Sequence, residues 1–153
     1  RFVGQSFYFT TEKLSRDDAM RSARAAAAER IASLVKRKYE AASTSLSHSG
    51  DAIDPTRVTR EYERYNATAV VTDLDDREWY VEKWSLPTGV GFKAYVLATV
   101  SKKSVNDSVR RTAEQNAAKA YDEARNATTE TAKKQADDAA EVWNKLKAEG
   151  VVE

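Results

Sequence analysis

At every second position from Phe92 to Val100 the side chain is apolar, and this alternation is the strongest strand pattern in the chain. In residues 79–84 the odd-numbered positions would face one way and the even-numbered positions the other, and the segment LPTGVG, with Pro87 and Gly89, separates the two stretches. The pattern predicts a β-hairpin over about residues 75–103. We expect one face of it to pack on helices and the other to be partly exposed to water.

Two tryptophans, Trp79 and Trp84, lie in the first strand of this hairpin. Because an odd separation along a strand puts side chains on opposite faces, only one of the two rings can enter the core. The other ring is available for a partner. Rings of this kind anchor interfaces well because they bury a large area with few rotatable bonds.

The first thirty-odd residues predict a strand followed by a helix. Residues 2–9 are rich in aromatic and β-branched types, and Gly4 marks a bulge or a close approach of another backbone. Ser15 and Asp18 then have the spacing of a capping pair at a helix start. One face of this helix follows steps of three and four residues, through Met20, Ala23, Ala27, Ile31 and Leu34.

Two further elements are expected before the hairpin. Residues 35–47 alternate loosely and end in serines and threonines, which predicts a strand at a sheet edge. Asp54 and Pro55 favour a helix start, so a second helix is predicted over about residues 55–70.

From Ser104 to Gly150 the chain contains no other glycine and no proline, which predicts one long helix. A helix of about 46 residues would be roughly 69 Å long, more than the diameter of so small a domain. We therefore expect an α+β fold of order β-α-β-α-β-β over residues 1–102, a long alanine-striped helix over 103–149 and a tail over 150–153.

A narrow stripe of small residues on so long a helix cannot be covered by a small domain, and we expect it to lie against another copy or another protein. Its contacts would give a homo-oligomer, with Trp84 of the hairpin as a further interface residue. The residues expected at these helical contacts are Ala113, Ala117, Ala120, Ala124, Trp143 and Leu146.

Composition excludes several kinds of chemistry. The net charge is +1 and there is no cysteine, so no strong field attracts nucleic acid and no thiolate is present. The single His48 lies among serines, and the acidic run at 73–78 lacks the glycine and glutamate of a calcium loop, so we expect a loop histidine and a polar connector. No phosphate-binding loop occurs, and we expect no catalytic, cofactor or metal site.

Four stretches of the first 102 residues carry a family resemblance. They are FVGQS at 2–6, Ala19, Ala23 and Ala27 leading to RIASLV, EWYVEK at 78–83 and AYVLATVSK at 94–102. In these stretches the chain resembles the bacterial outer-membrane lipoprotein family of the twenty-kilodalton Helicobacter lipoprotein, whose relatives include flagellar FlgP and the N-terminal domain of FlgT. The chain lacks a lipid-bearing cysteine and begins at Arg1, so we expect it to be processed or trimmed.

The resemblance implies a non-enzymatic structural module of the cell envelope that faces the periplasm or associates with the outer membrane and assembles into rings, disks or filaments. Its partners would be further copies, other envelope proteins, and the membrane only through a lipid anchor absent from this chain. Two alternatives remain open. A small-ligand or peptide-binding domain would use the sheet face around Trp84 and Tyr95, and a nucleic-acid binder would use the arginines at 57–64.

Overall fold

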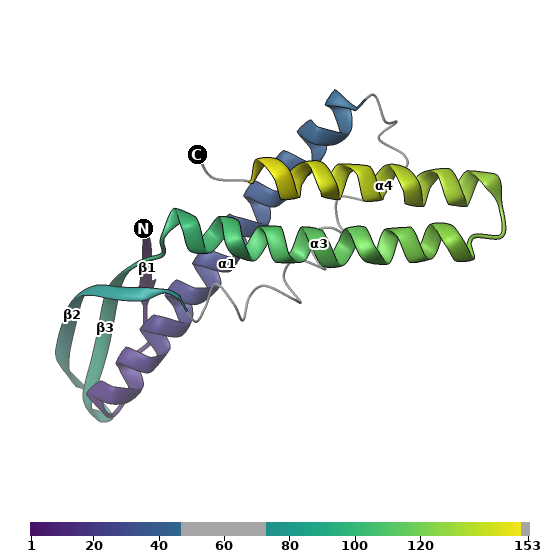
Figure 1. Ribbon diagram of the computed structural model, residues 1–153. Coiled ribbons are helices and arrows are strands. Elements are labelled where there is room, and N and C mark those ends of the chain that lie inside the picture. Colours follow the sequence, from purple (N-terminus) through teal and green to yellow (C-terminus); the bar gives the residue numbers. More distant parts are fainter. Residues whose placement is uncertain (47–72, 151–153) are drawn as a thin grey trace. The chain divides into compact units, whose positions relative to one another are not determined.

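A computed structural model of the chain describes residues 1–46 and 73–150. The fold is α+β, as the sequence predicts, and these residues form two compact units. Unit 1 contains residues 1–30 and 73–101 of the described chain, and unit 2 contains residues 31–46 and 102–150. The elements in chain order are β1 (Phe2–Gln5), α1 (Glu12–Ser45), β2 (Asp75–Leu86), β3 (Gly89–Thr99), α3 (Lys102–Asn126) and α4 (Glu130–Glu149) (Figure 1).

The sheet of unit 1 is antiparallel, with β3 in the centre between β1 and β2. The predicted hairpin is confirmed: Tyr80 of β2 pairs with Tyr95 of β3, and a turn at residues 87–88 joins the strands. Gly89, which follows the turn, has a φ of 124°, a conformation that side-chain-bearing residues rarely adopt. The pairing shifts by one position between Asp76 and Glu78, so β2 is regular from Glu78 onward.

Small side chains allow α1 to lie close to one face of this sheet. The alanines at 19, 23 and 27 pack against the alternating apolar residues 94, 96 and 98 of β3. Gly4 of β1 is part of the same contact, since a Cβ built there would lie 2.7 Å from the backbone nitrogen of Ala23 and would also meet the carbonyl oxygen of Ala19. The close backbone approach expected at Gly4 is therefore confirmed.

The two faces of the hairpin separate its tryptophans as the alternation predicts. Trp79 is half-buried and packs against the core of unit 1, together with Val81. Trp84 lies on the opposite face and is 46% exposed. One ring has thus entered the core and the other remains in contact with solvent.

Helix α1 starts earlier and ends later than expected. Its first turn is capped by Thr11, whose hydroxyl accepts a hydrogen bond from the backbone nitrogen of Leu14 at 3.2 Å, whereas Ser15 is buried and donates to the carbonyl oxygen of Glu12 at 2.7 Å. The capping pair proposed at Ser15 and Asp18 is therefore wrong. The true cap precedes it by one turn.

The strand predicted over residues 35–47 is also wrong, because α1 continues to Ser45. Val35, Tyr39 and Ala42 are buried at steps of four and three residues, which is the period of a helix. Valine and tyrosine have a weak intrinsic preference for strands, and this preference is small enough for packing of the helical face to override it.

The single long helix predicted over residues 103–149 is replaced by two helices, α3 and α4, that run side by side within unit 2 (Figure 1). Thr129 interrupts the helix: its backbone is extended, with φ −127° and ψ 150°, and its side chain accepts a hydrogen bond from the nitrogen of Ala132 at 3.1 Å. A threonine cap therefore starts α4 without any glycine or proline.

Folding back buries the stripe of small residues inside the chain. Lys147 of α4 forms an ion pair with Glu114 of α3 at 2.8 Å, and the ring of Trp143 lies 4.9 Å from that of Tyr39 in the last part of α1. Lys145 also donates a hydrogen bond to Ser45. Unit 2 therefore combines α3, α4 and the C-terminal part of α1.

Four sequence predictions lie wholly or mostly outside the described residues. They are the helix expected over about residues 55–70, the loop histidine His48, the arginine-bearing segment 57–64, and the tail over 150–153, of which only Gly150 is described.

Candidate binding surface on the sheet of unit 1

The face of the sheet opposite α1 carries a group of exposed aromatic side chains. Because side chains alternate along strands, the even-numbered residues of β2 from 78 to 84 share this face with the odd-numbered residues of β3 from 93 to 97. Tyr80 is 62% exposed, and Tyr8, in the segment between β1 and α1, is 45% exposed. We call the group formed by Tyr8, Tyr80, Trp84, Lys93 and Tyr95 the aromatic row.

The members of the aromatic row contact one another in a continuous line. The rings of Trp84 and Tyr8 are 6.1 Å apart, and those of Tyr80 and Tyr95 are 5.9 Å apart. The ammonium nitrogen of Lys93 lies between these two pairs, 5.3 Å from the ring centre of Tyr8 and 5.5 Å from that of Tyr95. Each distance is within the range of favourable ring–ring or cation–ring contact.

The rings in this row are tilted relative to one another. The planes of Tyr8 and Trp84 are inclined by 83°, and those of Tyr80 and Tyr95 by 40°. Trp84 is further oriented by its indole nitrogen, which donates a hydrogen bond to a carboxylate oxygen of Glu82 at 2.7 Å. Neighbouring rings of the row therefore meet edge to face or at a tilt, and they do not form one flat surface.

The side chains of the aromatic row are of the kinds that bind a partner molecule. Phenol, indole and ammonium groups supply apolar area, hydrogen-bond donors and one positive charge, and the row contains no paired nucleophile and base. Such side chains are the ones that dominate binding energy at protein interfaces. A group of exposed rings this size on one face is also typical of an interaction surface.

The interface residues predicted on the long helix do not form an exposed surface. All six are buried within unit 2, with exposed fractions between 0% and 6%. The reason is that α4 folds back along α3, so the stripe meets its own chain. These buried residues are Ala113, Ala117, Ala120, Ala124, Trp143 and Leu146.

Trp84, the seventh predicted interface residue, is exposed, and half-buried Tyr95 of the alternative binding site lies in the same row. Sequence reasoning missed Tyr8, Tyr80 and Lys93. The alternation of the hairpin could have placed Tyr80 and Lys93 on the face of Trp84. Tyr80 and Trp84 are even-numbered positions of β2, and these share a face with the odd-numbered positions of β3, such as Lys93. Tyr8 follows β1 and joins the row only through the tertiary fold.

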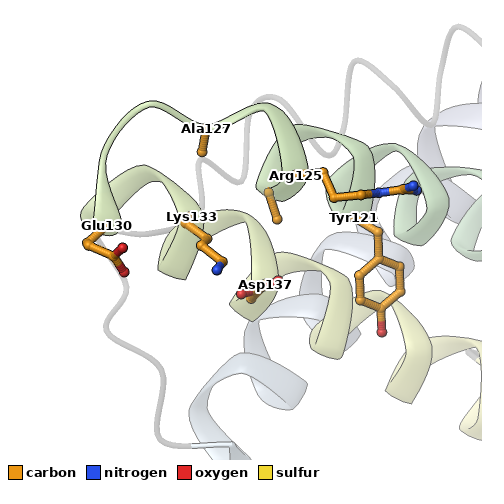
Figure 2. Close-up of a pocket in the computed structure, with 7 residues that line it drawn as sticks. Tyr121, Arg125, Ala127, Glu130, Lys133 and Asp137 are labelled. Carbon is orange, nitrogen blue, oxygen red and sulfur yellow. The ribbon is translucent and has the colours of Figure 1, made fainter.

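A second candidate is a hollow of about 720 Å³ at the turn between α3 and α4 (Figure 2). Arg125 and Lys133 contribute positive charge to its wall, and Glu130 and Asp137 contribute negative charge. Arg125 already forms an ion pair with Asp122 at 2.6 Å. The charges of the wall balance, and no arrangement of a nucleophile and a base is present among the residues that line it.

The acidic run at 73–78 does not form a metal site. Most of it belongs to β2 and not to a connector as expected, and Asp75 pairs with Arg77 at 3.6 Å while Asp76 accepts a hydrogen bond from the indole nitrogen of Trp79. Within residues 1–46 and 73–150 no three carboxylate or histidine side chains come together as metal ligands would.

No helix within residues 1–46 and 73–150 has the length and apolar character needed to span a bilayer.

Comparison with known proteins gives no relative from which a function could be transferred. No family model, no curated protein and no solved structure matches this chain.

Proposed function

We propose that this protein is a non-enzymatic binding module of the bacterial cell envelope, and that it holds an extended peptide on the aromatic row of unit 1. The observation that carries the proposal is the continuous line of four rings and one ammonium group on a sheet face that no described helix covers. A protein that needed these side chains only for stability would gain more from burying them.

The charge of the row favours a peptide over a nucleic acid. Proteins that bind single-stranded nucleic acid combine exposed rings with a positively charged groove. The face of the row carries Glu78 and Glu82 beside Lys93, which disfavours a polyanion. Apolar side chains of a peptide would pack on the exposed rings of the row.

The envelope location rests on the resemblance of β1, α1 and the hairpin to the lipoprotein family. The hypothesis that the long helix supplies lateral contacts is given up, because its stripe is buried in unit 2. Self-assembly by another surface remains compatible with the family resemblance, and the proposed peptide could belong to another envelope protein.

The three tryptophans provide a direct test, since each indole N–H gives its own signal in a nitrogen–proton correlation spectrum. Titration of the full chain with a library of extended peptides should shift the signal of Trp84. The signals of half-buried Trp79 and buried Trp143 should stay in place. Trp84→Ala should then weaken the binding of the selected peptide about tenfold or more, as expected for a central aromatic contact.

Tyr121→Ala is the matched control, because Tyr121 has the same exposed fraction as Trp84, 46%, but lies on α3 in unit 2. It should leave peptide affinity unchanged. A ligand that shifts only the Trp143 signal would show that the binding site lies in unit 2. Tight binding of single-stranded oligonucleotides or oligosaccharides in place of peptides would reject the assigned ligand class.

A further inference from the structure

The second strand of the hairpin, β2, presents a long edge with no neighbour in the described part of the chain. β2 is 12 residues long and pairs with β3 on one side only, because β3 is the central strand. Edge strands of this length offer a row of unpaired backbone groups to another strand. The edge is formed by backbone groups of β2, whereas the aromatic row consists of side chains on the sheet face, two of which, Tyr80 and Trp84, belong to β2.

The hydrogen bonds of β3 establish which backbone groups of β2 point outward. Phe92 exchanges backbone hydrogen bonds with Phe9, at 2.9 and 2.7 Å, so the even-numbered residues of β3 point toward β1. Its odd-numbered residues therefore bond to β2, and their partners there are the even-numbered Tyr80 and Glu82. The N–H and C=O groups of the odd-numbered residues, including Val81, consequently face the free edge.

A second copy of this chain can satisfy those groups through a symmetric antiparallel pairing of β2 with β2. A two-fold axis perpendicular to the sheet keeps the same face of both copies on the same side. In this symmetry odd-numbered residues stand opposite odd-numbered residues of the partner. The outward-facing backbone groups of the two strands therefore meet. The hydrogen-bonding requirement is met in every such register, and the choice among registers falls to the side chains.

Charge selects one register within the regular part of β2, from Glu78 to Leu86. Each register is named after its central residue, which stands opposite the same residue of the partner. A register centred on Tyr80 puts Glu78 opposite the partner's Glu82, and a register centred on Glu82 or on Lys83 puts that charged side chain opposite its own copy. Like charges directly opposite one another on paired strands are destabilising. Only the pair centred on Val81 avoids them while keeping a long overlap.

In the register centred on Val81, no like charges stand directly opposite one another. Trp79, whose ring already carries the guanidinium of Arg16 at 5.0 Å, stands opposite the partner's Lys83, and Tyr80 stands opposite the partner's Glu82. Both contacts occur twice because of the symmetry. In this register the edge of β2 is therefore complementary to itself in hydrogen bonding and free of opposed like charges.

We propose that two copies of this protein associate by antiparallel pairing of their β2 strands, with Val81 opposite the partner's Val81, to form one continuous sheet. The pairing leaves the aromatic rows of both copies on the same side of that sheet. It does not require the proposed peptide ligand.

The test is sedimentation equilibrium of the full chain over a range of concentrations, with two opposite substitutions at one exposed position. Tyr80→Glu places two pairs of like charges across the interface, whereas Tyr80→Lys places two pairs of opposite charges there. Tyr80 is 62% exposed, so both variants should fold. The dissociation constant of the Glu variant should exceed that of the Lys variant by about tenfold.

Net charge cannot produce this result, because the Lys variant carries the larger net positive charge and would repel its copy more strongly. Adding Glu82→Lys to Tyr80→Glu restores opposite charges and should restore association. If both single variants weaken association equally, the register centred on Tyr80 applies and the one proposed here is wrong. A wild-type chain that remains monomeric up to about 1 mM overturns the pairing altogether.

Amide hydrogen exchange gives an independent readout that locates the contact. Association should protect the outward-facing amides of Trp79, Val81 and Lys83 in a concentration-dependent way, while those of Tyr80 and Glu82, already bonded to β3, should not change. Protection confined to another element would place the interface elsewhere. Peptide binding to the row could fail without affecting any of these measurements, so the two proposals are tested separately.

Discussion

Trp84 in unit 1 is 46% exposed, whereas Trp143 in unit 2 is 4% exposed, although both lie on elements with one apolar side. Trp143 contacts Tyr39 of α1 with ring centres 4.9 Å apart, so its ring fills the space between helices. Trp84 contacts Tyr8 at 6.1 Å on a sheet face that α1 does not cover. The same residue type therefore serves a core in one unit and a surface in the other.

The difference follows from the geometry of the elements. A sheet has two faces, and in unit 1 the part of α1 that packs on it covers one of them. In unit 2 each helix has a single apolar side, and α3 and α4 place these sides against each other. Side chains on the second face of the sheet remain available for partners, while Trp143 of the helical unit is buried and contributes to stability.

The largest expected effect separates the two tryptophans. Trp143→Ala should destabilise the protein by about 3–5 kcal/mol, because it leaves a cavity next to Tyr39. Trp84→Ala should cost less than about 1 kcal/mol, as exposed positions usually do. Urea unfolding followed by the helical circular dichroism signal measures both. Similar losses for the two variants would refute the contrast between the units.

The close approach of β1 to α1 should produce the next largest effect. Gly4→Ala introduces a Cβ that meets the backbone of Ala19 and Ala23, and backbone atoms cannot move aside as a flexible side chain can. We expect a loss of about 1–3 kcal/mol in the free energy of unfolding. Val3→Ala, at a neighbouring residue that is 64% exposed, is the control and should have little effect. Equal stability of Gly4→Ala and wild type would mean that the strand and helix lie farther apart.

The turn between α3 and α4 should be sensitive to its cap. Thr129→Ala removes the hydroxyl that accepts from the nitrogen of Ala132, which should cost about 1 kcal/mol. Thr128→Ala, one residue earlier and exposed, should stay within about 0.5 kcal/mol of wild type. Thermal unfolding of the two variants makes the comparison. If Thr128 capped α4 instead, Thr128→Ala would be the more destabilising of the two variants.

The smallest effect concerns the ion pair that joins the two helices. A hydrogen bond from Lys147, together with its charge, lowers the pKa of the Glu114 carboxyl below its ordinary value of 4.5. A carboxyl whose pKa is lower in the folded chain stabilises it above pH 4.5 and loses that contribution as the pH falls through the folded-state pKa. Glu114→Gln should therefore reduce stability slightly at about pH 7, and this loss should shrink as the pH falls through the folded-state pKa of Glu114.

Salt provides the control for this last prediction, because both partners are partly exposed and their attraction is screened. The difference between wild type and Glu114→Gln at neutral pH should shrink in about 1 M salt. A difference that persists at low pH would point to a role for Glu114 outside the ion pair.

Part of unit 1 could be predicted from sequence because its signals are local. The alternation from Phe92 to Val100 and the turn residues Pro87 and Gly89 define the hairpin. The odd separation of Trp79 and Trp84 along β2 places their rings on opposite faces. The aromatic row could only be predicted in part. Tyr8 reaches Trp84 and Lys93 through the pairing of β1 with β3, which no local pattern specifies.

In unit 2 the buried positions were largely predictable, but the path of the chain was not. The stripe from Val105 to Ala124 is buried as its period requires. The interruption at Thr129 has a local signal, a threonine followed by the acidic Glu130, but absence of glycine and proline favoured a continuous helix. In α1, the residues Val35 and Tyr39 were assigned to a strand because a loose alternation was weighed above the helical spacing of Val35, Tyr39 and Ala42.

The sequence by itself determined which side of each helix and strand must leave water, because the periods of 3.6 and 2 residues fix the faces that apolar residues share. It also determined that the long alanine stripe needs a neighbour. Only the tertiary structure decided that this neighbour is α4 of the same chain and that one face of the sheet is left uncovered by the elements within residues 1–46 and 73–150. The physical reason is that burial is non-directional: the free energy gained by removing a methyl group from water does not depend on which surface covers it.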